Sequence, residues 1–102
     1  MQQTLNSTQK KHFRGMAMGL KAEIFVGKAG ITANVIRQMQ RGLEQHELIK
    51  VRFTTRPKTE KEALCTELET ATESCLCGMV GHAASFYKQH PDPEKQRIAL
   101  PQ

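Results

Sequence analysis

The stretch Ile24-Phe25-Val26-Gly27-Lys28-Ala29-Gly30-Ile31-Thr32 decides how this chain folds. Its first residues are β-branched or aromatic, which favours a half-buried strand. Glycine permits backbone angles that a side chain forbids, so Gly27 and Gly30 predict a tight loop. Thr32 is a suitable N-cap for a helix whose apolar residues recur at helical spacing, at Val35, Ile36, Met39 and Leu43. The stretch therefore predicts a strand, a Gly-Lys-Ala-Gly loop and the start of a helix.

A loop of this kind can receive an anion. Backbone N–H groups at a helix N-terminus attract negative charge, together with the positive end of the helix dipole. Lys28 adds a positive side chain at the tip of the loop. The simplest anion that fits is a phosphate, either of a nucleotide or of a nucleic-acid backbone. A strand-to-helix turn that binds nothing would have the same pattern.

The spacing excludes two nucleotide-binding motifs. A Walker A loop requires a glycine where Ala22 stands and a serine or threonine where Ala29 stands. A dinucleotide fingerprint requires a third glycine where Ala33 stands, and an acidic residue about 20 residues on, where Lys50 stands. A short Gly-x-x-Gly clamp on a nucleic-acid backbone, of the length that the KH module uses, remains.

The charge of the chain is unevenly distributed. Its 102 residues fit one domain, and the formal net charge is +5. Up to Lys58 the chain holds 11 Lys/Arg and 3 acidic residues, whereas from Thr59 onward it holds 4 basic and 7 acidic residues. The basic half contains the glycine loop. This asymmetry favours a polyanionic partner, first nucleic acid and second acidic lipid, although a solvated basic face gives the same balance.

Three helices are predicted from periodicity. The first begins near Ser7 or Thr8 and has one apolar face, formed by Phe13, Met16, Ala17 and Leu20. The second covers residues 32–46. The third begins after Thr59 as N-cap and buries a stripe of Leu64, Leu68 and Ala71.

Four strands complete the domain. They cover residues 22–26, 48–53, 75–80 and 83–88, and Gly81-His82 joins the last two. In the second strand Ile49, Val51 and Phe53 alternate with Lys50, Arg52 and Thr54, so one face is apolar and the other basic. The order α-β-α-β-α-β-β predicts a single α/β domain with a mixed four-stranded sheet, parallel pairs and a final antiparallel hairpin.

The sequence divides the chain into a domain and two terminal segments. Residues 1–7 are expected to be flexible, residues 8–90 to form the domain, and residues 91–102 to form a proline-containing tail in which Ile98 and Leu100 lie against the body. The N-terminus has no apolar stretch of signal-peptide length and the chain has no membrane span, so a cytoplasmic location is expected.

Several motifs together point to a known family. They are Lys-x-x-Phe-Arg-Gly at residues 10–15, Val-Gly-Lys-x-Gly-Ile-Thr at 26–32 followed by Asn34-Val35-Ile36, His-Glu-Leu-Ile-Lys-Val at 46–51, Gly81 followed by Tyr87-Lys88, and a Pro-containing end with Ile98 and Leu100. With these motifs, the chain resembles the bacterial stand-alone CRM domain, the YhbY type of RNA-binding protein. The resemblance covers most of the sequence from Gln9 to Pro101.

The resemblance implies a fold similar to the C-terminal domain of translation initiation factor three. It also implies binding to ribosomal RNA or precursor large subunits during ribosome assembly. The RNA contacts that it implies are the loop and basic positions Gly27, Lys28, Ala29, Gly30, Lys10, Lys11, Arg14, Lys50 and Lys88. Two departures concern the last hairpin, where His82 replaces a frequent arginine and Ala83, Ala84 and Ser85 replace bulkier residues.

The sequence gives little support for a metal site or a catalytic site. Cys75 and Cys77 are spaced too closely for a zinc knuckle, and Cys65, His82 and His90 supply no second pair. Small buried hydrophobic residues are the simpler interpretation of the three cysteines, although the sequence leaves their burial open, and neither a metal nor another cofactor is expected. No nucleophile motif is present, so neither an enzyme nor a small-molecule substrate is expected. Tyr87 is the aromatic residue predicted to stack on a base.

Two further functions stay open. One is a protein-interaction adaptor on the ribosome that uses the acidic third helix, with Glu67, Glu69 and Glu73. The other is an architectural role on duplex DNA. The chain is expected to be a monomer.

Overall fold

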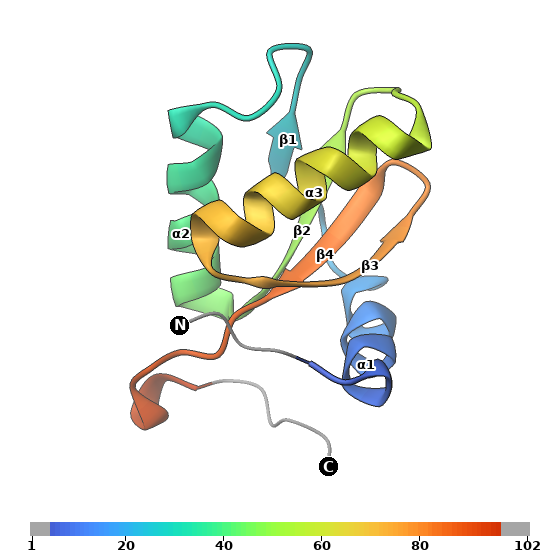
Figure 1. Cartoon of the computed structure of the whole chain (residues 1–102). Coiled ribbons are helices and arrows are strands. Elements are labelled where there is room, and N and C mark those ends of the chain that lie inside the picture. The colour runs from blue at the N-terminus through green and yellow to red at the C-terminus, as the bar shows by residue number, and fades with distance from the viewer. Residues whose placement is uncertain (1–4, 97–102) are drawn as a thin grey trace.

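Helices and strands alternate along the chain as the periodicity predicts (Figure 1). The computed structural model describes residues 5–96. Its elements are α1 (Ser7–Ala17), β1 (Ile24–Val26), α2 (Ala33–His46), β2 (Leu48–Phe53), α3 (Lys58–Thr72), β3 (Cys75–Val80), β4 (Ala83–Tyr87) and a short 3₁₀ helix, Pro93–Lys95. The predicted packing of Ile98 and Leu100 lies outside the described residues.

The four strands form one mixed sheet in the order β1-β2-β4-β3. β1 and β2 are parallel, whereas β4 is antiparallel to both β2 and β3. A register shift between Leu76 and Gly78 interrupts the β3–β4 ladder. The predicted fold class, with its parallel pair and its final hairpin, is confirmed.

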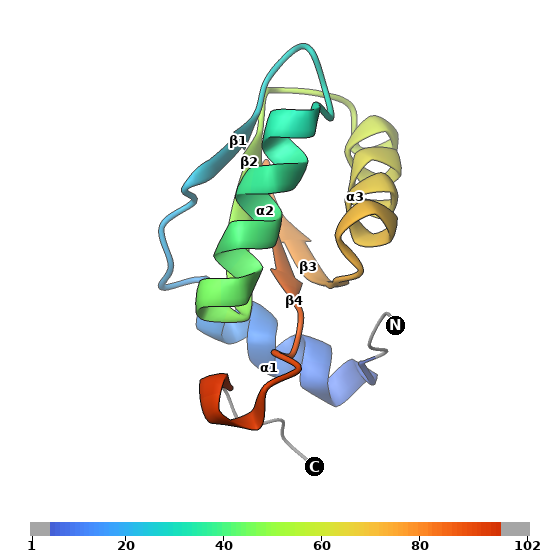
Figure 2. The ribbon, with the colours of Figure 1, turned by 90° about the vertical axis from the view of Figure 1, so that its left-hand side faces the viewer.

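α2 and α3 cover one face of the sheet (Figures 1 and 2). The core under them contains Ile49, Val51 and Phe53 of β2, as the alternation in that strand predicts. Lys50 and Arg52 lie on the other face of the same strand, because successive side chains of a strand point to opposite sides. Thr32 caps α2 by accepting a hydrogen bond from Val35 N at 3.2 Å, which confirms the predicted N-cap.

The predicted start and buried stripe of α3 are wrong in part. Pro57 occupies the N-cap position without a side-chain cap, so Thr59 is already inside the helix. The buried residues of α3 are Lys61, Cys65, Leu68 and Thr72, while Leu64 is half-buried and Ala71 is exposed. Lys61 tolerates burial because its ammonium donates to Gly81 O at 2.8 Å and lies 3.1 Å from His82 Nδ1.

α1 covers one end of the opposite face of the sheet. Phe13 and Ala17 of α1 pack in a second cluster with Leu5, Leu48, Cys75, Cys77 and Tyr87. Leu5 and Asn6 fall in the segment predicted to be flexible, yet Leu5 is buried, and Asn6 forms a capping box with Gln9. α1 ends at Ala17, so Met16 and Leu20 of the predicted apolar face are 41% and 40% exposed.

Tyr87 belongs to this second cluster, and its predicted role as a base-stacking residue is wrong. Its ring is fully buried and stacks on Phe13 with 4.3 Å between the ring centroids. Burial raises the pKa of Tyr87 to about 12, and the nearby charge of Glu47 acts in the same direction. The Tyr87 hydroxyl forms no hydrogen bond within the described part of the chain.

All three cysteines are buried, a point that the sequence left open. Burial raises the pKa of the Cys65 thiol to about 11 and that of the Cys77 thiol to about 12. A thiol with such a pKa is rarely deprotonated near neutral pH, so these two side chains act as small apolar residues.

Glu47 joins α2 to β2 and anchors the segment after β4. It lies at a φ of 62°, in the left-handed region that ends the helix, and it is fully buried. Its carbonyl accepts from Lys88 N at 2.8 Å, and its carboxylate accepts from His90 N at 2.7 Å. The Glu47 side chain therefore has a structural role. The sequence does not indicate this role, because it shows Glu47 only as one of the acidic residues.

Candidate nucleic-acid interface

The Gly-Lys-Ala-Gly loop is a tight turn between β1 and α2. Gly30 N donates to Gly27 O at 3.0 Å, which closes the turn over Lys28 and Ala29. Both of these middle residues are exposed. Gly30 has a φ of +76°, which favours glycine, whereas Gly27 has no positive φ. The backbone freedom predicted for both glycines is therefore used at Gly30 alone.

The N-terminus of α2 follows the turn directly. Val35 N bonds to the Thr32 side chain and Ile36 N bonds to Thr32 O. The N–H groups of Ala33 and Asn34 precede these bonds, on residues that are exposed. The turn and the helix terminus together present Lys28 and free N–H groups to the same solvent region, which is the arrangement that an anion requires.

Arg56 supports the loop from the inside. Its guanidinium donates to Gly27 O, to Thr54 Oγ1 at 3.0 Å and to the carboxylate of Glu60 at 3.3 Å. The Arg56 side chain is 10% exposed, so it is nearly withdrawn from solvent. The sequence shows Arg56 only as part of a basic loop, and no local pattern points to a carbonyl 29 residues away.

The basic residues of α1 and β2 lie on the sheet face that α1 partly covers. Lys10, Lys11 and Arg14 are exposed on α1. The side chain of Arg14 runs over Gly78, where an added Cβ would lie only 2.4 Å from Arg14 Cδ. A small hollow of about 140 Å³ is lined by both Arg14 and Lys50. The structure thus brings these two predicted contacts together.

Lys88 lies apart from the loop. Its backbone pairs with Glu47 at the beginning of β2, while the glycine loop adjoins the end of that strand through Thr54 N and Val26 O. Its ammonium donates to Thr72 O at 3.2 Å, at the C-terminus of α3. Lys88 therefore has a structural partner, and its contact with RNA stays a prediction.

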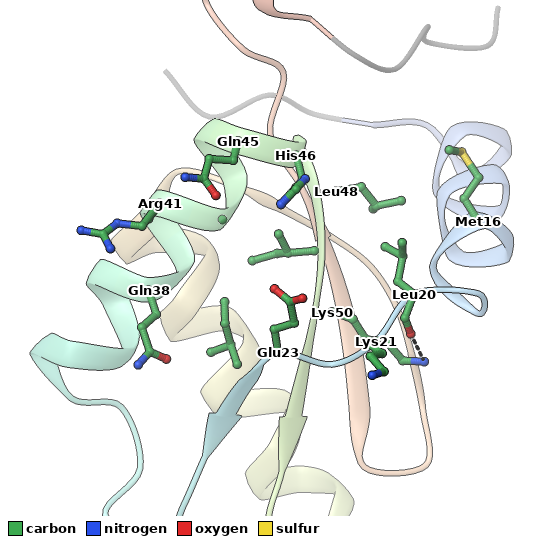
Figure 3. A pocket seen from close by; sticks show the side chains of 13 residues that line it. Met16, Leu20, Lys21, Glu23, Gln38, Arg41, Gln45, His46, Leu48 and Lys50 are labelled. Carbon is green, nitrogen blue, oxygen red and sulfur yellow. Dashed lines mark hydrogen bonds between the residues drawn. The ribbon is translucent and has the colours of Figure 1, made fainter.

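A larger groove separates α1 from α2 (Figure 3). Its volume is about 460 Å³, and its lining includes Met16, Leu20, Arg41 and His46. The Lys50 ammonium reaches into this region and lies 3.4 Å from Leu20 O (Figure 3). The groove therefore combines apolar walls with basic residues from α2, from β2 and, through Lys21, from the segment between α1 and β1.

Within residues 5–96, no group of three or more histidine, cysteine or acidic side chains could hold a metal ion. None of the helices in this range is long and apolar enough to cross a lipid bilayer.

Comparisons with known proteins identify the family of the chain. The model of the CRS1 / YhbY (CRM) domain matches residues 5–88. "Probable RNA-binding protein PA4753" of Pseudomonas aeruginosa is 34% identical over 91 residues, covering 89% of this chain and 88% of the relative. "Probable RNA-binding protein YqeI" of Bacillus subtilis is 32% identical over 97 residues, covering 95% and 99%.

A solved structure has the same fold. It is the solution structure of the hypothetical protein SAV1595 from Staphylococcus aureus, a candidate RNA-binding protein. It superposes with a TM-score of 0.82 at 31% identity, covering 96% of this chain and 100% of the other. The match of the family model over most of the chain, together with these relatives, shows that the protein belongs to the CRS1 / YhbY (CRM) domain family.

Proposed function

We propose that this protein binds RNA through the Gly-Lys-Ala-Gly loop and the adjacent basic surface, and that its target is ribosomal RNA in precursor large subunits during ribosome assembly. The RNA-binding names of its relatives support the binding of RNA. The family resemblance of the sequence motifs suggests the ribosomal target.

The observation that carries the proposal is the exposed Lys28 on a braced turn at a helix N-terminus. In this proposal, a backbone phosphate lies against the loop N–H groups and the Lys28 ammonium. Arg56 holds the loop in shape before RNA arrives, so little conformational entropy is lost on binding.

A wider footprint extends from the loop over the basic face. Arg14 and Lys50 contact further phosphates, and Lys10 and Lys11 extend the positive potential along α1. Contacts of this type position a protein on nucleic acid without reading its sequence. They also release counterions, so affinity should fall steeply as the salt concentration rises.

The test compares Lys28→Glu with Arg41→Glu. Both variants change the net charge equally, but Arg41 is exposed more than two helical turns along α2 from the end that adjoins the loop. Binding to a ribosomal RNA fragment is measured by fluorescence anisotropy at several salt concentrations. We expect Lys28→Glu to weaken binding at least tenfold and to flatten the salt dependence, and Arg41→Glu to have a much smaller effect. Equal affinities of the two variants would refute the loop contact.

The target is tested separately by sedimentation of a lysate on sucrose gradients at low and high salt. Protein that peaks with precursor large subunits and is removed by salt would support the assembly role. Protein that stays at the top of the gradient at both salt concentrations would contradict it.

The acidic face of α3 carries the alternative function, that of a protein-interaction adaptor. Glu62, Glu67 and Glu73 are exposed there. Glu69, predicted as part of this surface, is half-buried and accepts a hydrogen bond from Leu76 N at 2.7 Å, so it holds β3 instead. Recovery of a defined ribosomal protein after nuclease treatment, lost on Glu67→Lys, would favour the adaptor.

A further inference from the structure

One face of the sheet is covered only at one end. On the side opposite α2 and α3, the strand positions form three rows that follow from the register. α1 covers the first row, which contains Leu48, Tyr87 and Cys75. Arg14 lies across the second row, which contains Lys50, Ser85 and Gly78.

The third row is open. It runs across all four strands and contains Phe25, Arg52, Ala83 and Val80. Among residues 5–96, no helix lies over this end of the sheet on the side away from α3 (Figure 2). Phe25 is 55% exposed and Val80 is 59% exposed. Arg52 between them is exposed, and its side chain has no hydrogen bond or ion pair with the described residues. Three strand spacings separate the ends of the row, a span of about 14 Å.

The Phe25 ring lies beside Gly27 of the glycine loop. Its Cε2 atom would lie 3.7 Å from a Cβ at Gly27, which is ordinary van der Waals contact. Arg52 is the direct neighbour of Phe25 on the adjoining strand. A strand of RNA whose phosphate lies at Lys28 therefore has an aromatic ring and an unpaired guanidinium next to it, on the same side of the sheet as Arg14 and Lys50.

The chemistry of the row favours one occupant. Unpaired bases stack on exposed aromatic side chains, and adjacent phosphates bind arginine. The strand positions of the second and third rows hold Lys50 and Arg52 and no acidic residue, and Arg14 lies over them. Glu23, two residues before Phe25, lines the groove of Figure 3 together with Lys50, so one acidic side chain lies beside the basic residues of this face. The positive charge suits a polyanion.

We propose that Phe25 stacks on an unpaired base of single-stranded RNA while Arg52 binds the adjoining phosphate. This inference rests on the proposed RNA-binding function and adds to it the kind of RNA, namely a single-stranded segment that leads away from the glycine loop.

The chain contains no tryptophan, which provides a direct probe. Phe25→Trp places a single indole in the proposed site. Its fluorescence is titrated with an eight-nucleotide single-stranded RNA and, separately, with a duplex RNA of the same length. We expect quenching by the single strand but not by the duplex. The matched control is Ala71→Trp, an exposed position on α3 that should show no quenching with either RNA.

Affinity gives the second measurement. We expect Phe25→Ala to weaken single-strand binding by a factor between about 5 and about 150, the usual loss for one stacked base. Binding to the duplex and the slope of affinity against salt should stay unchanged, because the ring carries no charge. Thr66→Ala, at an exposed position on α3, should change single-strand affinity by less than about twofold.

The outcomes separate the inference from the proposed function. If the single strand binds the wild type but neither quenches Phe25→Trp nor loses affinity with Phe25→Ala, the stacking site is wrong and RNA binding stands. If Phe25→Ala weakens single-strand and duplex binding equally, Phe25 only supports the loop and the inference is overturned. If the wild type binds neither RNA, both proposals fail.

Discussion

Arg56 offers the sharpest test of how the fold prepares the glycine loop. Arg56→Met keeps most of the apolar volume and removes the guanidinium that holds Gly27 O, Thr54 Oγ1 and the Glu60 carboxylate. A hydrogen bond that involves a charged group contributes about 1.5–3 kcal/mol, and an exposed ion pair about 0.2–1 kcal/mol. The Glu60 side chain is 53% exposed, so its ion pair with Arg56 should contribute an energy near the lower limit of this last range.

We expect Arg56→Met to lower the free energy of unfolding by about 2–3 kcal/mol. The simple sum of the two hydrogen bonds is larger, but Gly27 and Thr54 are only half-buried and water replaces part of each bond. With an ordinary denaturant dependence, this loss moves the urea midpoint down by about 1–2 M. Amide exchange at Gly30, whose N–H closes the turn on Gly27 O, should accelerate.

Two companion variants make this prediction specific. Arg56→Lys keeps the charge but has one donor group for three acceptors, so most of the loss should remain. Glu60→Gln removes only the ion pair and should cost less than about 1 kcal/mol. If Arg56→Met unfolds within about 0.5 kcal/mol of the wild type and Gly30 stays protected, Arg56 does not brace the loop.

Three further predictions concern the core and the loop. Gly30→Ala should lower the free energy of unfolding in urea by about 1 kcal/mol, because the φ of Gly30 is +76°. Gly27→Ala should lower it much less, because the φ of Gly27 is not positive and the added Cβ has room. Equal losses in the two variants would contradict this. Tyr87→Phe removes a buried hydroxyl that lacks a partner among the described residues, so the free energy of unfolding in urea should stay the same or rise. A fall of more than about 1 kcal/mol in that free energy would contradict this. Folding raises the pKa of Cys65 to about 11 and the pKa values of Cys77 and Tyr87 to about 12. The stability that the neutral forms of these groups contribute is therefore present below pH 9 and is lost as the pH rises to 12. Urea midpoints measured across this pH range should fall, and they should fall less in Tyr87→Phe.

The sequence alone determined the elements and their order. The alternation in residues 48–53 marks which side of β2 is apolar, because the period of a strand is two. The glycine loop and Thr32 mark the end of β1 and the start of α2 through local turn and capping chemistry. The family motifs are also short stretches of sequence, and the family that they indicate is confirmed.

Tertiary packing decided which residues are available for function. Tyr87 and Phe25 are both aromatic residues on strands, yet Tyr87 is fully buried under α1 and Phe25 is 55% exposed. The difference arises because α1 ends at Ala17 and covers only one end of the sheet face. Periodicity shows which side of an element a residue occupies, but not what covers that side.

The same physical reason explains the residues that sequence reasoning missed. Arg56 braces a carbonyl 29 positions away, Lys61 is buried against the β3–β4 turn, and Lys88 bonds to the end of α3. A basic residue in the sequence is equally compatible with binding RNA and with satisfying a distant backbone carbonyl. Only the arrangement of the elements in space, set by which apolar faces pack together, separates Lys28, which is exposed, from these three residues, which the fold itself uses.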